Sequence, residues 1–112
     1  ADINALFVGL ARASGRPARD LYGVRVAASA HAPSLGRAGG DVTTAQHCRA
    51  EVYVDGPGWL PVDPADVRKV LLDERPGAPL SDPLVARTRD RLFGSWEMNW
   101  VAYNDAHDVL LP

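Results

Sequence analysis

The first hydrophobic pattern along the chain predicts an amphipathic helix that spans roughly Asp2 to Ser14. Its apolar positions recur at the spacing of one helical face: Ile3, Leu6, Phe7, Leu10 and Ala13. The helix is predicted to stop at Ser14 and Gly15, because Gly15 favours a helix end and Pro17 follows two residues later. We therefore expect this stripe to face the rest of the domain.

The next polar and apolar positions alternate with the period of β-strands. One strand is predicted over Arg19–Ala28 and a second over Ala45–Val54. The second strand has an apolar face made of Cys48, Ala50, Val52 and Val54, and a polar face made of His47, Arg49, Glu51 and Tyr53. The Asp55-Gly56 pair is a strong hairpin signal, and the segment Trp59–Pro64 is the predicted return strand.

The length of this turn decides whether Asp63 and His47 can meet across the hairpin. A strict two-residue turn pairs Cys48 with Asp63, which is the wrong parity for a contact between Asp63 and His47. One extra residue in the turn sets Asp63 opposite His47 or Arg49, and the Gly-Pro-Gly run makes a longer turn easy. We then expect the Asp63 carboxylate to lie about 3 Å from one ring nitrogen of His47.

The second half of the chain predicts two short helices and a last strand. Asp63 can cap a helix over Pro64–Leu72, with proline at its first position, and a second helix is predicted over Leu84–Leu92. Trp96–Tyr103 fits a helix or a strand, and its aromatic and β-branched content favours a strand. His31–Thr44 has no period and is predicted to be a long, mobile loop.

Together these elements predict a single α+β domain over residues 1–112. The N-terminal helix is expected to pack on a small, mostly antiparallel sheet of three to five strands, with the two later helices outside it. A length of 112 residues is typical of one domain. The chain begins at Ala1 without an initiator methionine, so we expect the domain to be truncated at its N-terminus.

Composition narrows the classes of partner. The formal net charge is −2 and the basic residues are scattered, so no nucleic-acid partner is expected. No apolar run reaches the roughly 20 residues that a membrane-spanning helix needs, so no membrane partner is expected either. Cys48 is the one cysteine, which excludes an internal disulfide and leaves the cellular compartment open.

His47 and Asp63 are the candidate site residues, because an imidazole held by a carboxylate is the base half of a nucleophilic site. The alternatives are an ordinary strand histidine and a simple helix cap. Arg49 and Glu51 share the face of His47 and are expected to be solvated. A metal site built from His47, Cys48, His31 and His107 has no supporting ligand spacing, so we expect no metal and no cofactor.

Three blocks resemble the transglutaminase-like superfamily of papain-type thiol enzymes. Residues 1–19 (ADINALFVGLARASGRPAR) are similar to its nucleophile helix, and His47–Tyr53 resembles its histidine strand, where an aromatic residue more often stands at the position of Arg49. Gly58–Pro64 resembles its aspartate strand. These blocks cover about the first 65 residues. The tail, Arg91–Pro112, looks like the segment that follows the core in small bacterial members.

The resemblance implies a papain-like core and cysteine-dependent acyl transfer or amide hydrolysis through a thioester. It assigns His47 as the general base and Asp63 as its orienting acid, with Trp59 either walling the substrate cleft or packing in the core. The implied partner is a protein or peptide that offers a glutamine, another amide side chain or a peptide bond. The family's cysteine would stand immediately before Ala1, so the chain by itself is expected to be inactive.

Three further points concern the nucleophile, the class of function and the type of reaction. Cys48 points to the opposite face of its strand from His47, so we expect it to be a packing thiol rather than a substitute nucleophile. The alternative function is a non-catalytic binding or scaffolding domain that retains the fold. A cysteine encoded directly before Ala1 favours the enzyme, and any other residue there favours the scaffold. The resemblance does not distinguish a transglutaminase from a protease or an amidase.

Overall fold

The computed structural model describes residues 2–112 as an α+β domain, which confirms the predicted fold class. The elements in chain order are α1 (Asp2–Ala13), β1 (Ala18–Arg25), the 3₁₀-helix η1 (Pro33–Leu35), β2 (Gln46–Val54), β3 (Gly58–Val62), α2 (Pro64–Glu74), α3 (Pro83–Arg91) and β4 (Trp100–Asn104). The four strands form one antiparallel sheet in the order β3-β2-β1-β4. Within residues 2–112, no helix has both the length and the apolar character that crossing a membrane requires.

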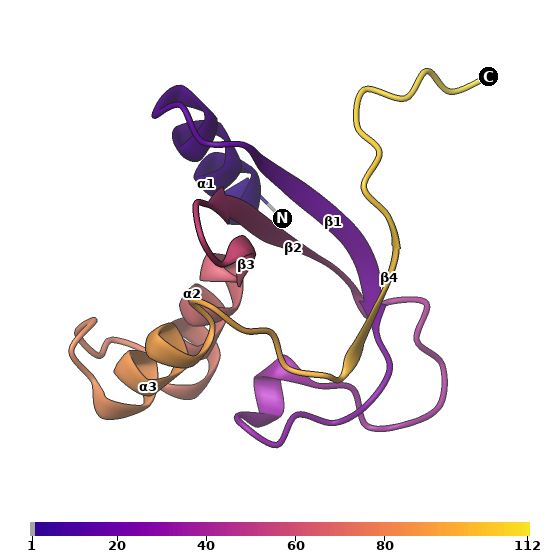
Figure 1. Cartoon of the computed structure of the whole chain (residues 1–112). Coiled ribbons are helices and arrows are strands. Elements are labelled where there is room, and N and C mark those ends of the chain that lie inside the picture. Colours follow the sequence, from indigo (N-terminus) through magenta and orange to yellow (C-terminus); the bar gives the residue numbers. More distant parts are fainter. Residues whose placement is uncertain (1) are drawn as a thin grey trace.

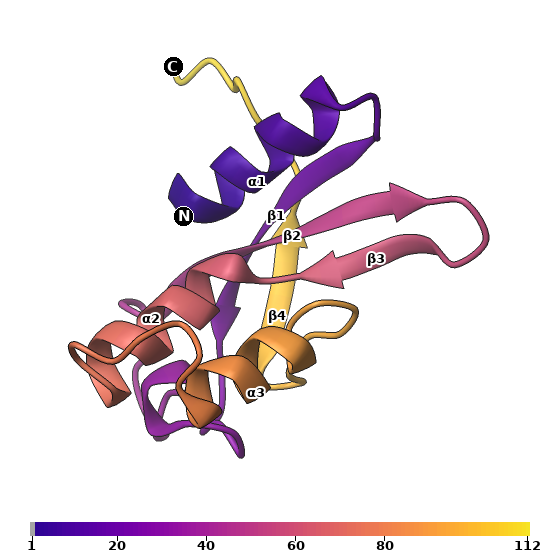
Figure 2. The same cartoon turned by 90° about the vertical axis from the view of Figure 1, so that its left-hand side faces the viewer.

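Helix α1 covers one face of the sheet, and the other two helices lie near the end of β3 (Figures 1 and 2). The core between α1 and the sheet is small and consists of Val8, Ala18, Ala50, Val52 and Val62. A second apolar cluster joins η1 to α2 and α3 through Ala32, Leu35, Val70 and Leu92. Asp63, the candidate site residue at the start of α2, lies in the chain between Val62 of the first cluster and Val70 of the second.

The face of α1 that packs on the sheet differs from the predicted stripe. It is formed by four positions at helical spacing: Asn4, Phe7, Val8 and Ala11. The predicted core positions Leu6 and Leu10 are 62% and 63% exposed. The prediction was wrong because Asn4, a polar residue that breaks the hydrophobic pattern, is fully buried and fixes the rotation of the helix through its hydrogen bonds.

The hairpin has the longer turn that the sequence favours. Val54 pairs with Gly58, which leaves a turn of three residues, and Ala50 pairs with Val62. Continuing this register places Asp63 opposite Arg49 on the polar face of β2. Gly56 and Gly58 have φ angles of 94° and 82°, a left-handed region that favours glycine, so the Gly-Pro-Gly run determines the turn.

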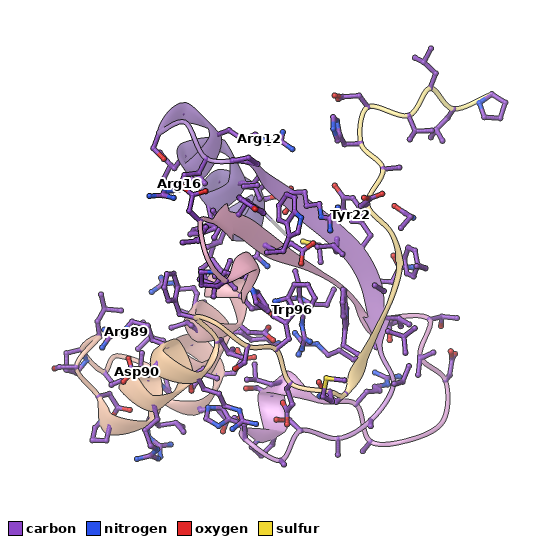
Figure 3. The ribbon with its side chains drawn as sticks, viewed as in Figure 1. Arg12, Arg16, Tyr22, Arg89, Asp90 and Trp96 are labelled. Atoms are coloured by element: carbon purple, nitrogen blue, oxygen red, sulfur yellow. The ribbon has the colours of Figure 1, made fainter. Side chains whose placement is uncertain are left out.

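The last strand is shorter than predicted, because only Trp100–Asn104 pairs with β1. Residues 96–99 form a loop instead, and the Glu97 carboxylate accepts hydrogen bonds from the Ser29 hydroxyl and the Ala30 N–H, both at 2.7 Å. Trp96 lies between the sheet and the helices (Figure 3) and donates its ring N–H to the Val62 carbonyl at 3.0 Å. This segment covers the polar face of β2, which decides the environment of the site.

We predict that Gly23→Ala disrupts the packing of β4 on β1. A Cβ atom at Gly23 would lie 2.3 Å from the Val101 carbonyl oxygen and 2.5 Å from the Trp100 ring. Such a clash should lower the free energy of unfolding by about 2 kcal/mol, measured by urea unfolding with tryptophan fluorescence. The matched control is Gly9→Ala in α1, where nothing lies within 4 Å and stability should rise by about 0.5–1 kcal/mol. Equal stability of Gly23→Ala and the wild type would contradict this register.

Candidate active site

His47 and Asp63 form the contact that the hairpin register predicts. The imidazole Nε2 lies 2.8 Å from Asp63 Oδ2, with the His47 side chain 10% exposed and the Asp63 side chain fully buried. The pairing of β2 with β3 ends where Val62 lies opposite Ala50. Strand β3 therefore does not extend along β2 as far as His47. Because Nε2 faces the carboxylate, Nδ1 is the ring nitrogen left for a reacting group.

Asn4 connects α1 to this pair. Its amide nitrogen donates to the Cys48 carbonyl at 2.9 Å and to Asp63 Oδ1 at 3.0 Å, while its amide oxygen accepts from the Ala65 N–H at 2.9 Å. The hydrophobic pattern of the sequence does not predict a role for Asn4. The signal was an asparagine among apolar residues of a helix, which is costly to bury unless its polar atoms are paired.

Asp63 is at the same time the N-cap of α2, as its position before Pro64 predicts. Its Oδ1 accepts the Asp66 N–H at 3.2 Å. Burial alone would raise the pKa of Asp63, but the hydrogen bonds from His47 and Asn4 and the charge of Arg49 outweigh it, so the pKa is lowered. The carboxylate is therefore ionised at neutral pH, which suits an acid that orients an imidazole.

Arg49 and Glu51 are buried, which corrects the prediction that both are solvated. Arg49 is 2% exposed, with Nε 3.2 Å from Asp63 Oδ2 and Nη1 donating to the Glu97 carbonyl at 2.7 Å. Glu51 accepts a hydrogen bond from Arg19 at 2.5 Å. The alternation of β2 gave the correct face, but the sequence did not show that the segment before β4 covers it.

A second carboxylate, Asp66, stands beside the imidazole. Its Oδ1 is 3.4 Å from His47 Nε2, and Arg25 binds both carboxylate oxygens at 2.5 and 3.0 Å. Burial raises the pKa of Asp66, and the hydrogen bonds from Arg25 only partly offset it while the charge of Asp63 adds to it. Two acids next to one imidazole thus have pKa values shifted in opposite directions.

The ligand atoms of His47, Asp63 and Asp66 all lie within 4.8 Å of one another, close enough to hold a metal ion. Arg49 already lies beside Asp63, and Arg25 already binds Asp66 on both oxygens. A cation would therefore have to compete with two buried guanidinium groups for the same oxygens. The donor set suits a hydrogen-bonded imidazole better than a divalent ion.

His47 borders three cavities. The largest, about 420 Å³, is shared with Asp2 and Ile3 at the start of α1 and with residues of α2. A second, about 180 Å³, is shared with Tyr22 and Tyr103; Tyr22 lies on the side of β1 toward the C-terminal segment (Figure 3). A third, about 320 Å³, lies toward the loop that contains η1. The start of α1 and the imidazole thus open into one space.

The side chains of Cys48 and Trp59 take no part in this contact, although Cys48 lines the cavity of about 180 Å³ beside His47. Cys48 is buried, its burial raises the pKa of the thiol, and the alternation of β2 points it away from the face of His47. Trp59 pairs with Tyr53, six residues along β2 from His47 and therefore roughly 20 Å away, at the turn of the hairpin (Figure 2). There its ring packs on Tyr53 and under the guanidinium of Arg19.

Comparison with known proteins gives two matches. The family model described as the transglutaminase-like superfamily matches residues 1–64. A protein of Haemophilus influenzae, described as uncharacterized, is 41% identical in an alignment 116 residues long that includes 96% of this chain. The chain spans only 31% of the length of that relative. No solved structure matches the chain.

We predict that Asp63→Asn destabilises the domain in a pH-dependent way. At pH 7 the loss should be about 3 kcal/mol, because the variant leaves the Arg49 charge without its buried partner. The folded-state pKa of Asp63 is lowered, so its contribution is present above the unfolded value of about 3.9 and is lost as the pH falls through the folded-state value.

Urea unfolding at pH 7, 5 and 3 measures this dependence. The difference between wild type and variant should be similar at pH 7 and 5 and smaller at pH 3. Asp90→Asn is the matched control, because Asp90 is 77% exposed on the outer side of α3 (Figure 3) and its loss should change stability by less than about 0.5 kcal/mol at any pH. A constant difference down to pH 3 would contradict an ionised Asp63.

Proposed function

Because the chain belongs to the transglutaminase-like superfamily, we propose that it is the core of a cysteine-dependent enzyme that acts on amides through a thioester. The observation that supports this most is the imidazole of His47, which lies 2.8 Å from a buried carboxylate and opens into the cavity shared with the start of α1. In the intact protein the nucleophilic cysteine would immediately precede Ala1. The finer assignment of His47 as base and Asp63 as orienting acid is part of this proposal.

The start of α1 is a favourable place for such a thiolate. Unpaired backbone N–H groups and the helix dipole stabilise a negative charge at a helix N-terminus, and a nearby imidazolium lowers the thiol pKa further. A proton passes from the thiol to His47 Nδ1, while Asp63 holds the other ring nitrogen protonated. Asn4 fixes the distance between the helix and the acid through its bond to Asp63.

Acyl transfer would then proceed in two steps. The thiolate attacks the amide carbonyl, a sulfur–carbon bond forms, and the carbon–nitrogen bond breaks as His47 gives its proton to the leaving amine. In the second step His47 takes a proton from the acceptor, which attacks the thioester and releases the thiolate. An amine as acceptor makes the reaction a transamidation, and water makes it a hydrolysis. The substrate class is a protein or peptide with an amide side chain or a peptide bond.

We expect a thiol-directed acylating probe to label a longer form of the protein, one that includes the residues upstream of Ala1. Mass spectrometry should place the label upstream of Ala1 and not on Cys48, whose thiol is buried. His47→Ala should slow labelling by a factor of about 10² or more, because it removes the proton acceptor. His107→Ala is the matched control, because His107 is exposed and pairs with Asp108 outside the site.

The alternative outcome is a binding or scaffolding domain. An upstream residue other than cysteine, or labelling that is indifferent to His47→Ala, would reject the enzyme. Thermal melts of each variant separate the loss of labelling from a loss of fold. The contact between Asp63 and His47 would then be read as part of the helix cap at α2.

A further inference from the structure

The third cavity at His47 has a charge pattern that the proposed chemistry does not use. It is about 320 Å³ in volume and is enclosed by the end of β1, the loop around η1, the start of β2 and one side chain of α2. Besides His47 itself, the charged side chains that line it are all basic: Arg25, Arg37 and Lys69. The neighbouring 420 Å³ cavity, in contrast, is lined by both acidic and basic residues.

Arg37 is held in position by backbone contacts rather than by a direct ion pair. Its Nε and Nη2 donate to the backbone carbonyl of Asp41 at 3.1 and 2.8 Å. The Asp41 carboxylate is turned to the N–H and hydroxyl of Thr43 at 2.8 and 2.7 Å. Within residues 2–112, Arg37 makes no ion pair, whereas the charge of Arg25 is balanced by Asp66. The charge of Arg37 contributes to lowering the pKa of Asp41 but is not matched by a direct ion pair, so it is only partly offset at the border of the cavity.

Lys69 can turn toward the same cavity at little cost in stability. Its ammonium is 2.9 Å from Asp73, and both side chains are nearly half exposed. An exposed ion pair of this kind contributes little to stability, so the ammonium can turn toward another anion. Arg37, which is held in place, and Lys69, which can move, therefore line the same cavity as the imidazole of His47.

The loop that forms the far wall is already ordered for binding. The Arg37 N–H donates to the Ala27 carbonyl at 2.9 Å, and a side-chain N–H of Arg25 donates to the Leu35 carbonyl at 2.5 Å. The backbone at Gly36 packs so closely that an added Cβ would lie 2.2 Å from the Ser29 nitrogen. A wall that needs no ordering upon binding loses little of its interaction energy to entropy.

We propose that this cavity binds an anionic oxygen group, a carboxylate or a phosphate, carried by the acyl substrate, with Arg37 and Lys69 as its ligands. The identity of the carrier rests on the proposed function. The binding of the anion does not, because it needs neither the nucleophile nor the reaction. Since His47 borders this cavity and the one at the start of α1, the anion would sit beside the amide that reacts.

The test uses the 112-residue chain, labelled with ¹⁵N, at pH 7 and low salt. Glutarate and inorganic phosphate are the anionic probes, and glutaramide is the uncharged counterpart of glutarate. Both anions should give saturable shifts of the backbone amide signals of residues 34–37 and 44–47, and glutaramide should give none. The anion that binds more tightly identifies the group. Equal binding of glutaramide and glutarate would overturn the proposal.

Variants distinguish specific binding in this cavity from non-specific attraction of anions to basic residues. Arg37→Ala and Lys69→Ala should each weaken binding roughly three- to fivefold. Arg68→Ala is the matched control, because Arg68 lines the neighbouring cavity but not this one, and it should leave the affinity unchanged. Equal losses in all three variants, or shifts spread over the whole surface, would reject the site. If Arg37→Ala does not fold, the exposed Lys69 gives the same decision through Lys69→Ala and Lys69→Glu.

The two proposals can fail independently. Saturable glutarate binding without labelling of an upstream cysteine retains the anion site and rejects the thioester chemistry. Labelling without anion binding retains the chemistry and rejects the site. In the longer protein, a substrate that carries the anion should lose affinity in Arg37→Ala through KM, with kcat unchanged, because Arg37 does not touch the reacting atoms.

Discussion

The ionised carboxylate of Asp63 is the constraint on which the site depends. A fully buried charge is stable only when it is paired and hydrogen-bonded, and Asp63 obtains its partners from three elements: Asn4 of α1, His47 and Arg49 of β2, and the first turn of α2. The same atoms therefore orient the imidazole and hold the helix, the hairpin and α2 together. The proposed catalytic pair is thus also a structural junction of this domain.

The charges around this junction are balanced in pairs. Asp63 lies beside Arg49, and Asp66 is bound by Arg25, so two acids and two guanidinium groups surround one imidazole. Asp63 collects enough donors for its pKa to fall, whereas burial dominates at Asp66 and its pKa rises. Asp63, whose pKa is lowered, is the ionised carboxylate that contacts His47 Nε2. The ring is thereby oriented with Nε2 toward this carboxylate.

Local signals in the sequence predicted the parts of this arrangement that depend on neighbouring residues. Turn length and strand parity placed Asp63 near His47, and the Asp-Pro pair predicted the start of α2. The role of Asn4 was not predicted, because its three partners are 44, 59 and 61 residues away and hydrophobic periodicity reports only on neighbouring residues. The burial of Arg49 was not predicted for a similar reason, because it depends on a segment near residue 97 that packs across β2.

The end of β3 explains how the imidazole, on one face of the sheet, and the start of α1, on the other face, come to line the same cavity. Beyond Val62 the edge of β2 has no strand beside it, so the start of α1 reaches the space that His47 borders. The loop cavity with Arg37 opens onto the same ring. His47 therefore lines both cavities. In the proposed function, the early end of the hairpin would give the upstream nucleophile access to His47, and the basic residues of the loop cavity would favour an anionic group on the substrate.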